Sequence, residues 1–211
     1  MDITWLGHSS FLIEDSSGRK ILTDPFDETV GYDVYRGEPD LVTISHHHFD
    51  HGYVKLLPQK TRKLDSPGVF DFDGIRVTGI PSFHDKTKGS KRGKNTIFII
   101  EADGYRLCHL GDLGYVLSAP EIESLGEIDV LMIPVGGVFT IDGAEAASLS
   151  KAIGSHIILP MHYKTPAIDF EIAGLEPFLS IMGGAEETDS SKLTLKGELK
   201  GLNQVKVLKY E

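Results

Sequence analysis

Four residues with metal-ligand chemistry stand close together in one short segment: His46, His48, Asp50 and His51. Two histidines separated by one residue project to the same side of an extended chain, so His46 and His48 are expected to share a face and His47 to point away. Imidazole nitrogens and carboxylate oxygens are ligands that zinc and related divalent metals accept. This restrictive spacing predicts a metal site rather than a chance histidine run.

The segments around this cluster indicate how it would be positioned. A buried strand is predicted over Leu41–Ser45, and a short helix over Asp50–Leu57. Three further residues of ligand type, His84, Asp112 and His162, also follow predicted strands. Taken alone, each of the three is better explained by a structural hydrogen bond or a cap. Strands that end at one edge would bring all of them together.

The rest of the chain has a β-rich first half, then a βαβα stretch, then strands again. Asp-Gly pairs at Asp73 and Asp103 predict two hairpins. Predicted helices cover Pro120–Leu125, Ala144–Ala152 and Asp169–Phe178. Further strands are expected at Asp2–Leu6, Phe11–Glu14, Lys20–Thr23, Val69–Phe72, Ile75–Gly79, Thr96–Glu101, Tyr105–Leu110, Asp129–Ile133, His156–Leu159, Lys192–Leu195 and Gln204–Leu208. Two packed sheets with helices outside would satisfy this order, in a single domain over residues 1–211.

Short motifs in a fixed order make the sequence similar to the metallo-β-lactamase superfamily along most of the chain. They are Trp5–Phe11, Thr23–Pro25, His46–His51, Ser82–His84, His109–Asp112 and Pro160–Tyr163. The opening motif resembles that of a subgroup of small hydrolases that includes ascorbate-6-phosphate lactonase-like proteins. The resemblance implies an α/β fold, a four-layer αβ/βα sandwich of two mixed β-sheets flanked by helices, with its site at one edge.

The resemblance also implies two divalent metal ions. One would be held by His46, His48 and His84, the other by Asp50, His51 and His162, and Asp112 would bridge them. Zinc is the favoured metal, with manganese and iron as alternatives. A hydroxide bound by both metals would attack the substrate, and Asp50 would also orient that hydroxide.

Other residues are candidates for supporting roles. Asp24 is expected to orient a ligand histidine, or simply to start a turn before Pro25. His8 would contact substrate or donate a proton, with a structural hydrogen bond as the alternative. Thr140, which ends a glycine-containing loop, would face the site or lie in a close-packed turn.

A basic segment follows His84 directly and contains Lys86, Lys88, Lys91, Arg92 and Lys94. Such a concentration is unusual in a chain of net charge −10. The segment, and Lys86 and Lys88 in particular, would form a lid that attracts a phosphate or carboxylate substrate. A solvated surface loop is the alternative.

Composition limits the classes of function. With 31 acidic and 21 basic residues, the chain is not expected to bind nucleic acid. One cysteine, Cys108, allows no disulfide within the chain and suits a reducing cytoplasm. Neither a signal peptide nor a membrane-spanning run is visible. Oligomeric state is left open.

Together these features predict a metal-dependent hydrolase that cleaves an ester, lactone or phosphodiester bond in a small molecule, with an anionic substrate as one option. No G-x-S-x-G motif offers a serine nucleophile. Alternatives within the same fold are a di-iron redox protein, a nuclease and a non-catalytic metal-binding protein. Redox members tend to carry Glu at the position of His48, and a nuclease needs a basic surface.

Overall fold

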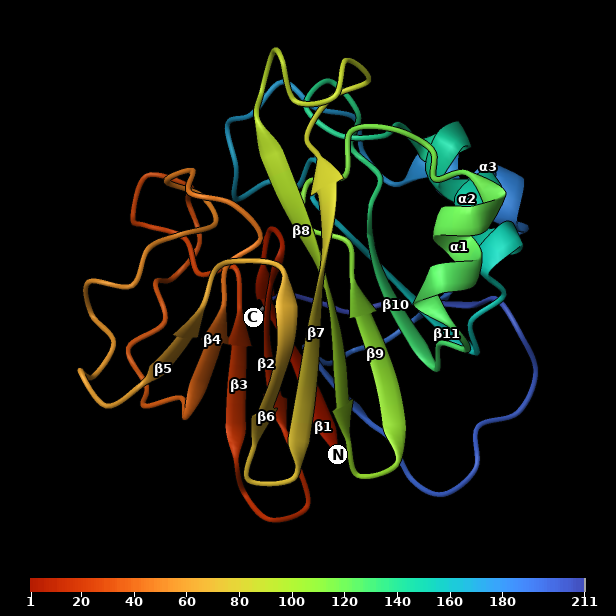
Figure 1. The fold of residues 1–211 in the computed structure, drawn as a ribbon. Coiled ribbons are helices and arrows are strands. Elements are labelled where there is room, and N and C mark those ends of the chain that lie inside the picture. Colours follow the sequence, from red (N-terminus) through yellow and green to blue (C-terminus); the bar gives the residue numbers. More distant parts are fainter. Residues whose placement is uncertain (211) are drawn as a thin grey trace.

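Two mixed β-sheets pack face to face in the computed structural model, which describes residues 1–210 (Figure 1). The six-stranded sheet has the order β13-β1-β2-β3-β4-β5, and the eight-stranded sheet has the order β12-β14-β11-β10-β9-β8-β7-β6. In the first sheet, β1 to β3 are antiparallel and β3 to β5 are parallel. In the second, β6 to β9 are antiparallel, whereas β9, β10, β11 and β14 are parallel.

The strands of the first sheet are β1 (Asp2–Gly7), β2 (Ser10–Glu14), β3 (Lys20–Thr23), β4 (Leu41–Thr43), β5 (Arg62–Leu64) and β13 (Lys192–Thr194). Those of the second are β6 (Gly68–Phe72), β7 (Ile75–Phe83), β8 (Lys94–Ala102), β9 (Tyr105–His109), β10 (Val130–Pro134), β11 (Ile157–Met161), β12 (Glu186–Glu187) and β14 (Gln204–Val207). The two predicted hairpins, β6–β7 and β8–β9, are confirmed, and so are the two strands near the end of the chain.

The core lies between the sheets and reflects the alternation of side chains along each strand. In β3 and β4, Ile21 and Leu41 contribute to the main core, whereas Leu22 and Val42 belong to a separate cluster on the opposite face. Strands β10 and β11 are buried at every residue, as expected for central parallel strands covered on both faces. Apolar residues therefore fix the register of the strand ends that carry the polar cluster.

Three helices occur among residues 1–210: α1 (Ala119–Leu125), α2 (Gly143–Ile153) and α3 (Glu176–Met182). All three lie beside the eight-stranded sheet (Figure 1). Asp142 caps the N-terminus of α2, because its side chain accepts hydrogen bonds from the backbone N–H groups of Ala144 and Glu145. Gly154, in the left-handed conformation, caps the C-terminus. The predicted sandwich of sheets and helices is confirmed. No helix in the described part of the chain is long and apolar enough to cross a bilayer.

The helix predicted over Asp50–Leu57 is wrong. A single turn forms there, because the backbone N–H groups of His51 and Gly52 both donate to the carbonyl of His48. The next N–H, from Tyr53, donates to Pro25 across the loop instead of continuing the turn. The segment then runs irregularly over the outer face of the first sheet, where Val54 and Leu57 pack against the cluster containing Leu22 and Val42.

The helix predicted over Asp169–Phe178 is also misplaced, since α3 begins only at Glu176. Residue Ala173 hydrogen-bonds through its backbone to both Gly136 and Lys164, which holds this stretch as a loop against its neighbours. Pro177 lies in the first turn of α3, where its fixed φ suits a helix start. Tertiary hydrogen bonds therefore override the local helical pattern.

Five strands end next to the polar residues singled out in the sequence. Strands β3, β4, β7, β9 and β11 are followed by Asp24, His46, His84, Asp112 and His162 respectively. The arrowheads of β3, β4, β7 and β9 point to the same side of the molecule (Figure 1). The two sheets thus deliver these side chains to one shared edge.

Candidate metal centre

The Asp112 carboxylate lies at the centre of a ring of imidazoles. Its Oδ2 atom is 3.2 Å from Nε2 of His84, 3.4 Å from Nε2 of His162 and 3.8 Å from Nε2 of His46. Its Oδ1 atom is 3.2 Å from Nε2 of His51. All five side chains are buried, although they come from four separate segments of the chain. One carboxylate therefore contacts histidines from both sheets.

Around this carboxylate the potential ligand atoms within residues 1–210 form three groups, each with all its atoms within 4.8 Å of one another. The first comprises His46, His48 and His84, the second comprises His8, Asp50, His51 and His162, and the third comprises Asp24, His46 and His51. The first two groups contain the two ligand sets that the resemblance implied, and Asp112 contacts both. His8, expected as a substrate contact or proton donor, joins the second group.

Several buried polar atoms in the centre have no hydrogen-bond partner within residues 1–210. They include Nε2 of His51, Oδ1 of Asp50, Oδ1 of Asp112 and both ring nitrogens of His8. Although His51 Nε2 and Asp112 Oδ1 lie close together, their geometry is not that of a hydrogen bond. Each such atom costs about 1–3 kcal/mol when it is left unpaired. Divalent cations would satisfy these atoms, so the donor set fits a metal site.

Burial and neighbouring charges set the protonation of the centre. Burial lowers the pKa of His46 to about 3 and that of His8 to about 4. Both imidazoles are therefore neutral near pH 7, the form that binds metals. Burial opposes ionisation of Asp112, but His162 and His51 hold the pKa of this carboxyl well below its usual range. Burial likewise opposes the charged form of His51, yet Asp112 and Asp24 raise its pKa well above normal.

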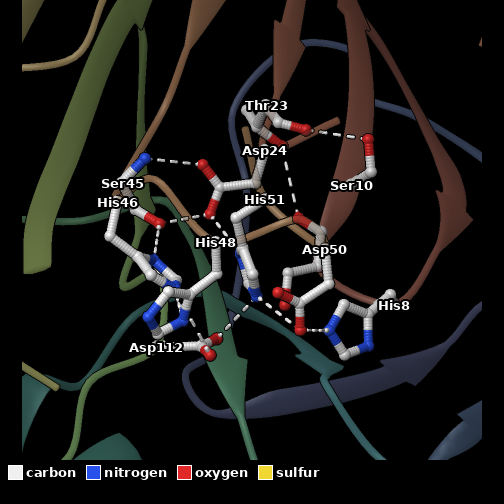
Figure 2. A network of polar contacts seen from close by, with 12 residues as sticks. His8, Ser10, Thr23, Asp24, Ser45, His46, His48, Asp50, His51 and Asp112 are labelled. Carbon is white, nitrogen blue, oxygen red and sulfur yellow. Dashed lines mark hydrogen bonds and ion pairs between the residues drawn. The ribbon is translucent and has the colours of Figure 1, made fainter. Parts of the chain in front are cut away.

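Asp24 orients two of the histidines (Figure 2). Its Oδ2 atom accepts a hydrogen bond from Nδ1 of His51 at 2.8 Å. Its carboxylate also accepts hydrogen bonds from the backbone N–H of Ser45 at 2.7 Å and from the Ser45 hydroxyl at 2.5 Å. The same hydroxyl lies 2.9 Å from Nδ1 of His46. Asp24 thus contacts His51 directly and His46 through Ser45, a residue that the sequence did not single out.

The backbone around the centre adopts uncommon conformations. His8, Asp24 and His162 have positive φ angles of 50°, 39° and 52°. Such angles are uncommon outside glycine and cluster at functional sites, where the surrounding structure maintains them. The carbonyl of His8 accepts hydrogen bonds from the backbone of His162 and from the Trp5 indole, and its Nε2 lies 3.4 Å from Oδ2 of Asp50. His8 is thereby fixed beside the second group.

The centre opens into a cavity of about 260 Å³. Its walls combine five residues of the centre with three phenylalanines and one arginine: His48, Asp50, His84, Asp112, His162, Phe49, Phe139, Phe170 and Arg92. His48 and Phe49 are exposed at the surface. The four residues outside the centre lie in four different loops, and no sequence pattern links them.

Other residues named from the sequence lie outside this cavity. Lys86 is exposed and forms an ion pair with Glu145, and Lys88 is exposed as well. The Thr140 hydroxyl donates to the carbonyl of Ile141 and lines a neighbouring cavity. His47 points outward, as predicted, and contacts Asp65. None of the residues Lys86, Lys88 and Thr140 is brought into the centre.

His109 and Cys108 are buried in β9. His109 is buried, with its Nε2 atom 2.8 Å from the carbonyl of Ser9. Burial raises the pKa of the Cys108 thiol to about 12, so this cysteine is not an activated nucleophile.

Comparison with known proteins agrees with the geometry of the fold and the centre. Residues 2–162 match the family described as "Beta-lactamase superfamily domain". The chain is 33% identical to a UPF0173 metal-dependent hydrolase of Methanoculleus marisnigri, covering 80% of this chain and 84% of the relative. It is 32% identical to the UPF0173 metal-dependent hydrolase of Methanoregula boonei, covering 78% and 83%.

A crystal structure from Thermotoga maritima is similar over the whole chain. It belongs to a metallo-beta-lactamase superfamily protein that is provisionally named a Zn-dependent hydrolase. The TM-score is 0.84 and the identity 36%, covering 100% of this chain and 99% of the other. The chain therefore belongs to the metallo-β-lactamase superfamily.

Proposed function

We propose that this protein is a metal-dependent hydrolase with two divalent ions, zinc being the favoured metal, in the centre around Asp112. The observation that carries the proposal is the convergence of seven ligand-type side chains on one buried carboxylate, with several of their atoms left unpaired. The proposal is also supported by the two relatives described above, both of which are named UPF0173 metal-dependent hydrolases. When bound, such ions act as Lewis acids and lower the pKa of water.

The residues of the chain have distinct tasks in this proposal. His46, His48 and His84 hold one ion, and Asp50, His51 and His162 hold the other. Asp112 lies between the two groups and contacts both. Asp24 and Ser45 keep the rings of His51 and His46 oriented through their Nδ1 atoms, which leaves the Nε2 atoms directed at Asp112. His8 lies beside the Asp50 carboxylate, where it can contact substrate or donate a proton.

The cavity lining favours attack by water over attack by a side chain. Within the described residues 1–210, no serine, threonine, cysteine or lysine lines it. The two carboxylates there, Asp50 and Asp112, both contact histidines of the centre. We therefore propose hydrolysis of an ester, lactone or phosphodiester bond without a covalent intermediate on the chain. A cavity of about 260 Å³ suits a small molecule, and its three phenylalanines limit the entry of bulk water.

The test combines metal removal with a substrate panel. A chelator should abolish hydrolysis of the responsive members of a panel of esters, lactones and phosphodiesters, and Zn²⁺ or Mn²⁺ should restore it. His48→Ala should lose activity, whereas His47→Ala, a matched change at the exposed neighbour, should retain it. Metal analysis with a visible spectrum distinguishes this enzyme from a di-iron redox protein. Activity that survives complete metal removal would contradict the proposal.

A further inference from the structure

The five cations of the segment 86–94 differ in their surroundings. Lys86, Lys88, Lys91 and Lys94 are exposed, whereas Arg92 is half-buried. Lys86 is already paired with Glu145. Among residues 1–210, Arg92 is the one lysine or arginine that lines the cavity over the centre. Of the five cations in this segment, Arg92 is therefore the one positioned to place a positive side chain beside a substrate held there.

The backbone that carries Arg92 is folded around the side chain of Asp85. Oδ1 of Asp85 accepts hydrogen bonds from the N–H groups of Thr87 at 2.7 Å and Gly89 at 3.0 Å. Its Oδ2 atom accepts from the N–H groups of Lys91 at 2.9 Å and Arg92 at 2.8 Å. One buried carboxylate thus ties together a loop that would otherwise be free to move, and it fixes where the Arg92 side chain begins.

The guanidinium of Arg92 is held over an aromatic ring. Its Cζ atom lies 4.7 Å from the ring centroid of Phe139, which is within the range of a cation–π contact. Among residues 1–210, no carboxylate is within ion-pairing distance of this guanidinium, in contrast to Lys86. Its five N–H donors are therefore available to a ligand while its position is fixed.

The cavity lining is complementary to a ligand with an apolar part and an anionic group. Phe49, Phe139 and Phe170 provide apolar walls. The single guanidinium matches one negative charge, which a carboxylate carries near neutral pH and a phosphate monoester exceeds. The overall charge of −10 disfavours the binding of anions elsewhere on the protein, so Arg92 provides a local exception at the cavity.

We propose that Arg92 binds a carboxylate group of the substrate, so that the enzyme selects carboxylate-bearing molecules over neutral ones of the same shape. This inference rests on the proposed hydrolase function, because the carboxylate is recognised beside the bond to be cleaved. One such substrate is a half-ester, a molecule with one free carboxylate and one ester group. Its hydrolysis adds one water across the acyl C–O bond and releases a dicarboxylate, an alcohol and a proton. Lys86 and Lys88, the residues favoured from the sequence, have no part in it.

Binding is tested on the metal-loaded protein with two amides, succinic acid mono-4-nitroanilide and butyric acid 4-nitroanilide, which differ only in carrying a terminal carboxylate or a terminal methyl group. Calorimetric titration should show about tenfold tighter binding of the charged amide by the parent protein. Arg92→Gln should bring the two affinities within twofold of each other. Lys91→Gln, which removes the adjacent exposed charge, should keep the preference, and Arg92→Lys should keep part of it. If Arg92→Gln still preferred the charged amide, the carboxylate would be bound by the metals and the inference would be wrong. Equal affinities of the parent protein for the two amides would also overturn it.

Turnover is measured separately, with 4-nitrophenyl hemisuccinate and 4-nitrophenyl butyrate. Loss of the charge preference in kcat/KM of Arg92→Gln, with the preference retained in Lys91→Gln, supports the inference. Hydrolysis of both esters at equal rates by parent and variant would refute carboxylate selection while leaving the hydrolase function intact. Selective binding of the charged amide without metal-dependent turnover of any panel substrate would refute the hydrolase function and leave Arg92 as a carboxylate site.

Discussion

Asp24 and His51 are joined by a hydrogen bond of 2.8 Å between Oδ2 and Nδ1, and neither side chain has exposed surface. Burial alone would favour the neutral acid, but the hydrogen bond from His51 keeps the pKa of Asp24 below its ordinary value. The carboxylate therefore remains charged and fixes which ring nitrogen of His51 faces Asp112. Hydrogen bonds of this kind control the orientation and basicity of ligand histidines.

Replacing Asp24 by Asn should weaken metal binding by about 10–100-fold, because the amide no longer provides a charged acceptor for His51. Equilibrium dialysis with metal analysis measures the affinity directly. Asp65→Asn is the matched control, since Asp65 contacts the exposed His47 away from the centre. Equal affinities for Asp24→Asn and the parent protein would show that Asp24 serves only the loop before Pro25.

Asp112→Asn should reduce the bound metal from two ions per chain to one or fewer, because Asp112 contacts histidines of both groups. We expect hydrolytic activity to fall by about 100- to 1,000-fold, the range seen when one preorganised polar group of an active site is removed. Metal content and kcat are measured on the same preparation, after circular dichroism has shown that the variant is folded. Two tightly bound ions with full activity would rule out a bridging carboxylate at this position.

The sequence made the strand ends predictable because ligand-type residues follow apolar runs. His46, His84 and His162 follow strands β4, β7 and β11, whose apolar residues lie in the core, so their convergence could be anticipated. The helix expected at Asp50–Leu57 could not be excluded in the same way. It fails because the Tyr53 N–H bonds to Pro25, a contact across 28 positions that local pattern cannot reveal.

The residues that line the cavity are harder to predict from the sequence. The five cations between residues 86 and 94 look equivalent until the Asp85 side chain folds their loop and Arg92 packs over Phe139. Charge alone therefore does not distinguish Arg92 from Lys86 and Lys88, the two residues favoured from the sequence. Thr140 lies at the neighbouring cavity because its hydroxyl bonds to the Ile141 carbonyl.

Gly111→Ala should destabilise the protein and disturb the centre more than Gly104→Ala. Both glycines have positive φ, at 56° and 79°, so the backbone strain of a new side chain is comparable. A Cβ at Gly111 would lie 2.4 Å from Oδ1 of Asn95 and 2.6 Å from Cβ of Ser45, whereas one at Gly104 meets nothing within 4 Å. Because Asn95 Oδ1 also accepts the N–H of Asp112, the clash should reach the bridging carboxylate. Urea unfolding and metal content of both variants give the comparison, and equal losses would contradict it.

Removing metal should lower the melting temperature as well as the activity. A ligand at about 100 times its Kd stabilises the folded state by about 2.7 kcal/mol. For a chain of this size that corresponds to about 5–11 °C. The shift should be smaller in Asp112→Asn, whose centre holds less metal. Differential scanning calorimetry with and without a chelator measures it, and an unchanged melting temperature in the parent would argue against stable metal binding by the folded chain.

Asp85→Asn should loosen the loop that carries Arg92. In the parent, Oδ1 of Asp85 accepts from Thr87 and Gly89 while Oδ2 accepts from Lys91 and Arg92. An Asn side chain replaces one of these oxygens by an NH₂ group, which meets backbone donors and cannot accept from them. Amide hydrogen exchange should therefore accelerate by about tenfold or more within residues 87–92, and the preference for the carboxylate-bearing anilide should decline.

The matched control for Asp85→Asn is Asp15→Asn, because Asp15 caps a similar turn through the N–H groups of Ser17 and Arg19, outside the cavity lining. That variant should speed exchange only around its own turn and leave ligand preference unchanged. If exchange within 87–92 stayed at the parent rate in Asp85→Asn, the loop would be held by contacts other than Asp85. Faster exchange with an undiminished carboxylate preference would instead show that Phe139 alone is enough to position the Arg92 guanidinium.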